Sequence, residues 1–262
     1  MTNQSLLTIE NLKIEINTPQ YYGELIKGFN FKVDQLKIVA LVGTSGSGKS
    51  SIGLSILRLL PDSMTATGGK IIFEGQDLLG LPQKNMQQIR GKDISMVFQE
   101  PLSTFNPVFT IGFQIEEVLK YHTPIKRRER KARIEELLGL VGVPEPRRVA
   151  NQYPHQLSGG LRQRAMIAQA IAANPKLVIA DEPTSNLDVT LQAVIIDLFR
   201  KLRNELKISI ILITHDLGVV REIADEVGIL YDGRIVEFGK PEDILQNPSH
   251  PFTCELVNAV KV

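Results

Sequence analysis

The residues with the strongest chemical implication lie in the stretch GTSGSGKSS, residues 43–51. It fits the spacing G-x-x-x-x-G-K-[ST], follows an apolar strand-like run and precedes a helical pattern. Glycines let backbone N–H groups curl around phosphate oxygens, and a helix N-terminus adds its positive dipole end. Lys49 would reach the outer phosphates and the Ser50 hydroxyl would ligate Mg²⁺. We therefore predict a phosphate-binding site formed by Gly43, Ser45, Gly46, Ser47, Gly48, Lys49, Ser50 and Ser51.

Two later apolar runs also end in polar side chains that could serve this chemistry. Asp181 and Glu182 follow the run KLVIA, and His215 follows ISIILIT. A buried carboxylate needs a partner, and Mg²⁺ held partly through water would supply one for Asp181. The Glu182 carboxylate is placed to polarise a water for attack on a γ-phosphate. A solvated acid pair and a structural histidine are the plainer alternatives, but three strands that each deliver a polar residue to one sheet edge favour a shared site.

The stretch HQLSGGLRQR, residues 155–164, is a second candidate for binding an anion. Ser158 precedes a helical pattern in the position of an N-cap, and Gly159 and Gly160 lack side chains that would keep an anion away. By itself the stretch is as easily an ordinary helix start. The sequence thus raises the question of why one chain should carry two phosphate sites so far apart.

The elements that must position these residues alternate between strand and helix patterns. The runs 37–43, 176–182 and 208–216 are short, apolar and rich in β-branched residues, as expected of strands covered on both faces. A helix is predicted between the last two, from about 189 to 206. This alternation indicates an α/β protein with a parallel sheet built from βαβ units.

The character of the chain changes from residue 101 to residue 173, where helical spacing predominates. We predict one domain of 262 residues, in which this helical subdomain is inserted into a β-rich core formed by residues 1–100 and 174–262. The first helix, after the phosphate loop, is expected to end at Pro61. A hairpin is expected around the turn Asp232–Gly233.

The composition excludes several classes of protein. Lys and Arg number 30 against 29 acidic residues, so the net charge gives no argument for a polyanionic partner. Cys254 is the only cysteine, which excludes an internal disulfide and any metal site of several thiolates. The apolar runs are far shorter than the ~20 residues of a membrane span, and we expect no secretory signal. The basic stretch 126–133 is interpreted as a solvated helix face, because acidic residues are interleaved with it.

Five stretches then carry a family resemblance: GTSGSGKS, MVFQEP, LSGGLRQR, VIADEPTSNLD and ITHD. Their order and spacing resemble those of ABC-type nucleotide-binding domains, over essentially the whole chain. The resemblance implies a P-loop NTPase (RecA-like) core with an antiparallel β subdomain and an inserted helical subdomain. It also explains the second anion site: Ser158, Gly159 and Gly160 would face the ATP held by a second subunit, and Asp188 would lie at that interface.

The same resemblance implies roles for three further side chains. Gln99 would join Ser50 and Asp181 in the Mg²⁺ shell, contact the attacking water and tether the helical subdomain to the core. His215 would contact the γ-phosphate and stabilise the closed state. Tyr22 is the candidate for stacking on adenine, with Tyr21 close behind.

A finer resemblance, to the peptide and nickel importer group, rests on PLSTFNPVFTIGFQI, ANQYPHQLSGGLRQR and NPSHPFTCEL. It implies an ATP-hydrolysing subunit at the cytoplasmic face of the membrane, which powers import by ATP-driven dimer closure. The implied partners are a second, related ATPase in a heterodimer, two transmembrane permeases that dock at residues 102–117, and an extracytoplasmic substrate-binding protein. A tail that stops at Val262 without a cysteine cluster favours nickel or metal-chelates over di- and oligopeptides.

Two other classes of ABC ATPase share the five motifs. Lipoprotein-releasing and cell-division ATPases lack the HPFT tail that this sequence carries. Nucleic-acid-associated ABC ATPases usually join two cassettes in one chain or insert long coiled coils. We therefore expect an importer subunit and no nucleic-acid partner.

Overall fold

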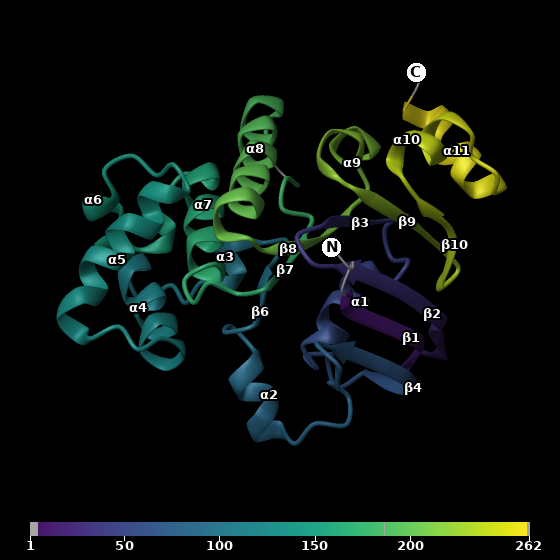
Figure 1. Ribbon diagram of the computed structural model, residues 1–262, viewed down its shortest axis with the longest axis horizontal. Coiled ribbons are helices and arrows are strands. Elements are labelled where there is room, and N and C mark those ends of the chain that lie inside the picture. Colours follow the sequence, from purple (N-terminus) through teal and green to yellow (C-terminus); the bar gives the residue numbers. More distant parts are fainter. Residues whose placement is uncertain (1–4, 186, 261–262) are drawn as a thin grey trace. The chain divides into compact units, whose positions relative to one another are not determined.

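The computed structural model describes residues 5–185 and 187–260. The chain forms two compact units, Met1–Met86 with Ser209–Val262 as the first and Gln87–Ile208 as the second. The division falls within helix α2 (Gln83–Ile89) and directly before strand β8 (Ser209–Thr214). Each unit is described by itself, with the labels of Figure 1.

The first unit contains a four-stranded antiparallel sheet in the order β2-β1-β4-β5. Strand β1 (Ser5–Thr18) pairs with β2 (Tyr21–Asp34) on one side and with β4 (Met64–Phe73) on the other, and β5 (Gln76–Asp77) completes the sheet. One face is buried and consists of apolar side chains, among them Leu7, Ile9, Leu12, Ile14, Phe29, Phe31, Val33 and Ile71. This sheet is the antiparallel β subdomain that the family resemblance implies.

The pairing of β1 with β2 contains a bulge that the sequence pattern did not indicate. The register shifts on both sides of Leu12, and Gly28 on β2 has a φ of +79°. Residues other than glycine rarely adopt such a φ, so the bulge favours glycine at this position. The fully buried positions of β2 consequently step from Ile26 to Phe29 instead of by two. Because this breaks the period of a strand, the alternation of apolar residues alone does not predict β2.

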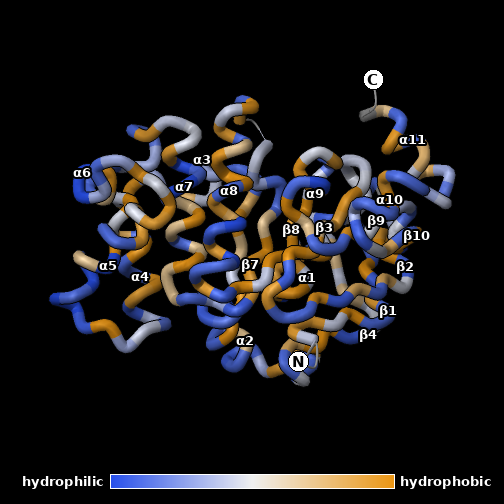
Figure 2. The backbone as a smooth tube through the Cα atoms, turned by 45° about the horizontal axis from the view of Figure 1, so that its top comes forward, coloured by the Kyte–Doolittle hydropathy of each residue, from blue (hydrophilic) through white to orange (hydrophobic). Residues whose placement is uncertain are grey.

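Three parallel strands, together with one antiparallel strand, form the rest of the core of this unit. Strand β3 (Ile38–Val42) lies between β8 and β9 (Glu226–Tyr231), and both neighbours run parallel to it. Strand β10 (Arg234–Gly239) pairs antiparallel with β9. Every residue of β3 and β8 is buried, and β8 is one of the hydrophobic segments of Figure 2. The predicted buried parallel strands are thereby confirmed.

Helix α1 (Lys49–Ile56) follows the phosphate loop directly. The expectation that it runs to Pro61 is wrong, because the helix ends at Ile56. Arg58 adopts a left-handed φ of +51°, and the N–H of Leu59 donates back to the carbonyl of Leu54 at 2.9 Å. These contacts close the last helical turn before the proline is reached.

The antiparallel sheet is joined to the parallel strands at the turn between β9 and β10. Asp232 and Gly233 have φ values of +45° and +72°, which is typical of a two-residue hairpin turn of type I′. The predicted hairpin is therefore confirmed. Lys27 of β2 donates its N–H to the Gly233 carbonyl at 2.9 Å, and its ammonium pairs with Asp232 at 2.5 Å.

Three helices complete the first unit. Helix α9 (Leu217–Ile223) follows β8 and is capped by the Asp216 carboxylate, which accepts the N–H of Gly218 at 2.7 Å. Helices α10 (Pro241–Gln246) and α11 (Pro251–Val260) follow β10.

The second unit has two parallel strands with helices between them. Strand β6 (Ile94–Val97) pairs with β7 (Leu177–Asp181), and the segment that connects them contains α3 (Pro101–Thr104), α4 (Ile111–His122), α5 (Arg127–Leu140), α6 (Pro146–Ala150), the 3₁₀ turn η1 (Pro154–Gln156) and α7 (Gly159–Ala170). Helix α8 (Val189–Leu206) follows β7, which confirms the helix predicted there. The helices predicted between residues 101 and 173 are also present, while the boundaries of the subdomain stay a prediction.

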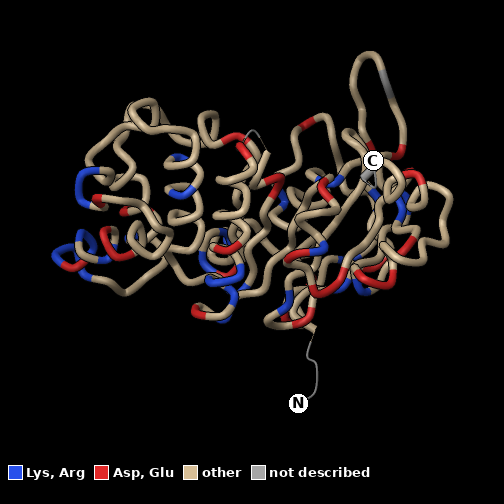
Figure 3. Tube along the Cα trace, turned by 90° about the horizontal axis from the view of Figure 1, so that it is seen from above, with Lys and Arg blue, Asp and Glu red and all other residues tan. Residues whose placement is uncertain are grey.

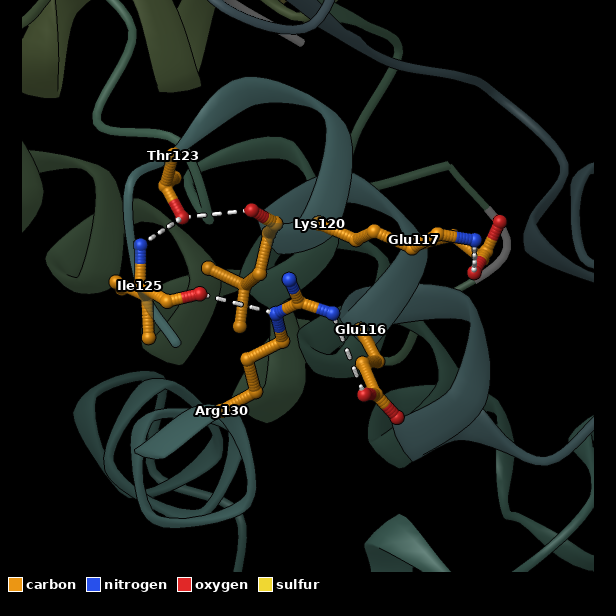
Figure 4. A network of polar contacts seen from close by, with 7 residues as sticks. Glu116, Glu117, Lys120, Thr123, Ile125 and Arg130 are labelled. Carbon is orange, nitrogen blue, oxygen red and sulfur yellow. Dashed lines mark hydrogen bonds and ion pairs between the residues drawn. The ribbon is translucent and has the colours of Figure 1, made fainter. Parts of the chain in front are cut away.

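Polar contacts fix the turn between α4 and α5 (Figure 4). The Thr123 hydroxyl donates to the carbonyl of Leu119 at 2.6 Å and accepts the N–H of Ile125 at 3.4 Å. Arg130 donates its Nε–H to the carbonyl of Ile125 at 3.1 Å, and its guanidinium pairs with Glu116 at 3.7 Å. These contacts set where α5 begins relative to the end of α4.

The basic stretch 126–133 lies on α5 and in the turn before it. Figure 3 shows its Lys and Arg residues next to acidic ones. Arg133 pairs with Glu136 at 2.8 Å, and Arg128 approaches Glu129 at 3.4 Å. These pairs fit the interpretation of a solvated helix face.

No helix among the described residues combines the length and the apolar character that a membrane span needs. Helix α8 has 18 residues, the most of any described helix, and it buries Ile195, Leu198 and Leu202 while its other faces carry charged side chains. Figure 2 shows the resulting alternation of hydrophobic and hydrophilic segments.

We expect Gly233→Ala to lower the free energy of unfolding by about 2–4 kcal/mol. A Cβ there would collide with the carbonyl oxygen of Leu25, in addition to the cost of the left-handed backbone. Gly75→Ala is the matched control, because Gly75 has a φ of +81° and nothing within 4 Å of its Cβ position. This control should cost only about 1 kcal/mol. Chemical denaturation of both variants measures the difference, and equal losses would contradict the packing described for the turn.

Candidate functional site

The phosphate loop stands at the carboxyl end of β3, in the first unit. Gly46 and Gly48 have φ values of +77° and +96°, which glycine adopts without strain. A Cβ at Gly48 would lie 2.7 Å from Ile26 Cδ1, and a Cβ at Gly43 would lie 2.6 Å from the carbonyl oxygen of Leu230. At Gly46 it would meet nothing within 4 Å. The loop is therefore packed against β2 and β9 at two glycines and open at the third.

Two side chains of the loop indicate that it is built to hold an anion. Lys49 is 5% exposed, and its ammonium donates to the carbonyls of Gly43 at 2.9 Å and Thr44 at 2.8 Å. The buried Ser47 hydroxyl finds no hydrogen-bond partner among the described residues. A buried ammonium attracts an anion more strongly than an exposed one, and a buried hydroxyl without a partner is rare unless a ligand supplies it. The loop fits the triphosphate group of ATP.

His215 leaves the same edge of the sheet as the phosphate loop. Val42 is the last residue of β3 and pairs with Thr214, the last residue of β8. The Thr214 hydroxyl accepts the N–H of Asp216 at 3.0 Å, which turns the chain directly after the strand. The structure thus brings the exposed His215 and the loop to one edge. Its contact with a γ-phosphate stays a prediction.

Gln99 and Glu182 meet in the second unit. Val97 pairs with Ala180 in the parallel register of β6 and β7, so both side chains come two residues after a paired position. Gln99 Nε2 donates to Glu182 Oε2 at 3.2 Å. Glu182 also has a left-handed φ of +44°, a conformation that costs a non-glycine residue roughly 1–3 kcal/mol and is found most often at functional sites.

The segment after Glu182 is held by contacts that sequence reasoning missed. The Glu182 carbonyl accepts the N–H of Ser185 at 3.1 Å and its hydroxyl at 2.8 Å. Gln192 of α8 donates to the carbonyls of Thr184 and Leu187, both at 3.3 Å. No motif marks Gln192, because a lone glutamine on a helix carries no signal until its neighbours are known.

The residues predicted to contact a second subunit's ATP lie at two helix starts. Ser158 is exposed and caps α7, with its hydroxyl accepting the N–H of Leu161 at 3.4 Å. Asp188 caps α8 and accepts the N–H of Leu191 at 2.9 Å.

The two glycines after Ser158 have different surroundings. A Cβ at Gly159 would meet nothing within 4 Å, whereas one at Gly160 would lie 3.2 Å from Leu191 Cδ1. Gly159 therefore leaves room for an anion, and Gly160 allows α7 to approach α8. The sequence assigned both glycines to the anion; the packing role of Gly160 is an addition from the structure.

The predicted magnesium ligands are one hydroxyl, one carboxylate and one amide. Ser50 is the second residue of α1, and Asp181 ends β7 with 5% exposure. No group of three His, Cys, Asp or Glu residues in the described part of the chain could hold a metal by itself. Such a sparse set fits Mg²⁺, which is usually bound through one or two carboxylates together with substrate phosphates.

Tyr22 lies on β2 and is 69% exposed. Its hydroxyl donates to Glu15 at 2.9 Å, and this hydrogen bond raises the pKa of Tyr22 above its ordinary value. Its role in stacking on adenine stays a prediction. The alternative, Tyr21, has a side chain outside the described part of the structure.

The predicted residues fall in both units of the chain. The phosphate loop, Tyr22 and His215 belong to the first unit. The second unit contains Gln99, Ser158, Gly159, Gly160, Asp181, Glu182 and Asp188. A glycine-turned loop with a buried lysine, set between a parallel strand and a helix, defines a P-loop nucleotide-binding protein of the α/β class.

Comparison with known proteins identifies the family. A profile described as ABC transporter matches residues 26–185, and the chain belongs to this family. The oligopeptide transport ATP-binding protein OppD of Bacillus subtilis (strain 168) is 49% identical over 255 residues, which cover 96% of this chain and 71% of that protein.

Solved structures agree with this assignment. Two dimeric structures of the ATP-binding cassette MJ0796, one of them bound to ADP and Pi, are 30% identical to the chain with a TM-score of 0.80. Each comparison covers 90% of this chain and 98% of the other. The expected fold class is confirmed, and the chain is an ABC-type ATPase.

We expect Lys49→Ala to weaken ATP binding by roughly tenfold to a hundredfold, since a charge-assisted hydrogen bond contributes about 1.5–3 kcal/mol. Lys70→Ala, at an exposed lysine of β4, is the matched control and should leave the affinity unchanged. Titration with ATP measures both variants, and a thermal melt shows whether each remains folded. Unchanged affinity in a folded Lys49→Ala variant would show that this lysine does not hold phosphate.

Proposed function

We propose that this chain is the ATP-hydrolysing subunit of a transporter that imports oligopeptides. The observation that carries the proposal is the 49% identity to the oligopeptide transport protein of Bacillus subtilis, spread over 96% of the chain. The intact phosphate loop supports the ATPase part of the proposal, because it retains the lysine and the glycines that the chemistry needs.

Different residues of the chain are proposed to bind phosphate, to activate water and to hold Mg²⁺. The backbone N–H groups from Gly46 to Ser50 and the Lys49 ammonium bind and orient the phosphates. The Glu182 carboxylate accepts a proton from the attacking water, and the Gln99 amide that donates to it holds the carboxylate in position. Mg²⁺, held by Ser50, Asp181 and Gln99, would neutralise phosphate charge.

We further propose that hydrolysis requires a second ATPase subunit. Exposed Ser158 and open Gly159 offer an anion-binding helix start in the second unit, whereas the chain's own phosphate loop belongs to the first. The MJ0796 structures are dimeric. ATP held between subunits stabilises the closed dimer, and its hydrolysis releases them. The partner proposed here is a related ATPase, which makes the pair a heterodimer.

The permeases are proposed to dock on the surface formed by α3 and the start of α4. This surface exposes Leu102, Val108, Phe109 and Phe113, with exposed fractions of 41–68%. The rings of Phe109 and Phe113 stack with centroids 4.6 Å apart. Clustered exposed apolar side chains mark protein contacts. Docking there would hold the chain at the cytoplasmic face of the membrane, with a substrate-binding protein on the other side.

Nickel is the second candidate cargo. It rests on the finer sequence resemblance, which includes both peptide and nickel importers, while the named relative is an oligopeptide transport ATP-binding protein. The proposed ATPase residues do not distinguish the two cargoes, so the following experiment measures uptake of both.

We expect Glu182→Gln to abolish uptake while preserving ATP binding, because the amide cannot accept the proton of the attacking water. Cells that lack the chain are complemented with the native sequence, with Glu182→Gln, or with Glu205→Gln on the exposed part of α8 as the matched control. Accumulation of a labelled tripeptide and of nickel is measured in each strain. Restored peptide uptake with Glu182→Gln would overturn the role of this carboxylate. Restored uptake of nickel alone would replace the peptide by the metal as cargo.

We expect Ser158→Arg to leave ATP binding by the isolated chain unchanged and to stop hydrolysis in the assembled transporter. The arginine would block the surface that a second subunit's phosphate approaches. Loss of the N-cap costs about 1 kcal/mol of stability, so Ser158→Asp is the second variant: aspartate keeps the cap and repels phosphate. Loss of ATP binding by the isolated Ser158→Asp chain would show that Ser158 serves the chain's own nucleotide.

A further inference from the structure

The first unit contains a cavity that none of the ATPase residues lines. It has a volume of about 790 Å³ and lies between α9, α10 and α11. This volume falls within the roughly 300–1,000 Å³ that is usual for pockets that bind small organic molecules. The side chains that decide its chemistry are Leu217, Arg221, Glu242, Asp243, Leu245 and Val257.

The apolar part of the cavity is buried and the charged part is exposed. Leu217 of α9 is 3% exposed and Val257 of α11 is 4% exposed, and Leu245 of α10 is half-buried. Arg221, Glu242 and Asp243 are exposed. A ligand that fills the cavity would therefore place an apolar group against the first three side chains and polar groups against the other three.

The charged side chains of the cavity are not neutralised within the described part of the chain. No ion pair joins Arg221, Glu242 or Asp243 to another described residue. The cation lies on α9, whereas the two carboxylates lie on α10. A guanidinium binds a carboxylate through paired N–H donors, and carboxylates bind an ammonium group. The cavity thus offers complementary partners for a ligand with a charge of each sign on separate ends.

The start of α11, one of the three helices around the cavity, is fixed by contacts that do not involve a ligand. The Glu237 carboxylate of β10 accepts the N–H of Ser249 at 2.9 Å and also that of His250, which lie directly before α11. Burial acts to raise the pKa of Glu237, but these amide hydrogen bonds outweigh it, and the pKa lies below its ordinary value. Phe252 of α11 stacks on Tyr231 with centroids 4.4 Å apart. The α11 side of the cavity is therefore held in place without a ligand.

We propose that this cavity binds a short peptide with a free N-terminus, a free C-terminus and an apolar side chain. Arg221 binds the terminal carboxylate, Glu242 and Asp243 bind the terminal ammonium, and the apolar side chain lies against Leu217 and Val257. Arg221 lies on α9 and the two carboxylates lie on α10, so a ligand that binds both must carry charged groups that reach both helices. The choice of a peptide over other zwitterions rests on the proposed peptide cargo, so the cavity would bind what the transporter delivers.

Calorimetric titration of the purified full chain with the dipeptide Leu-Leu tests the proposal. The capped dipeptide N-acetyl-Leu-Leu-amide keeps the apolar groups and lacks both charges. We expect Leu-Leu to bind at least about tenfold more tightly than the capped form. Arg221→Gln should weaken Leu-Leu by at least about tenfold, while Arg234→Gln, at an exposed arginine of β10, is the matched control and should change nothing.

Three results would overturn the proposal: no binding of Leu-Leu up to roughly 1 mM, equal binding of the free and capped dipeptides, or unchanged binding by folded Arg221→Gln. If Arg221→Gln does not fold, Glu242→Gln and the two dipeptides on the native chain still decide. The titration needs neither ATP nor permeases. Failure of peptide uptake in cells would therefore overturn the proposed function but not the binding site. Failure of Leu-Leu to bind the purified chain would overturn the binding site but not the proposed function.

Discussion

The parallel pairing of β3 with β8 and β9 is the constraint on which the phosphate site depends. It fixes the carboxyl end of β3, so that Gly43 packs on the backbone of β9 and His215 leaves the same edge. The loop can then curl only where glycines accept positive φ values, at Gly46 and Gly48. The antiparallel sheet also restricts the loop, because Ile26 of β2 lies against Gly48. The loop is thus held by packing on two sides before any ligand is present.

In the second unit, the left-handed backbone conformation is adopted by Glu182, a residue other than glycine. Glu182 follows a buried strand in a left-handed conformation, and the surrounding hydrogen bonds from Ser185 keep it there. The register of β6 and β7 brings Gln99 alongside, where it donates to the carboxylate. A residue held in this way by its backbone and its neighbours loses little orientational freedom when it acts as a base.

The residues proposed for ATP hydrolysis do not determine which cargo is transported. The ATPase residues are proposed to contact phosphate and water, and they carry no information about what is transported. The exposed aromatic pair Phe109 and Phe113 is suited to contact with another protein rather than with a solute. The cavity beside α9 is lined by the exposed Arg221 and the buried Leu217, and this combination suits a peptide. The proposed peptide site is therefore separate from the ATPase residues, none of which lines this cavity.

Sequence alone determined the motifs, the buried parallel strands and most of the helices, because these depend on local spacing and hydrophobicity. Packing decided the rest. Strand β2 escaped prediction because the bulge at Gly28 interrupts its period of two, and α1 ended at Ile56 because Arg58 turns left-handed. The contact of Gly160 with Leu191 likewise could not be read from spacing. Each of these depends on residues distant in sequence or on a backbone conformation that several residue types could adopt, and only the folded chain selects among them.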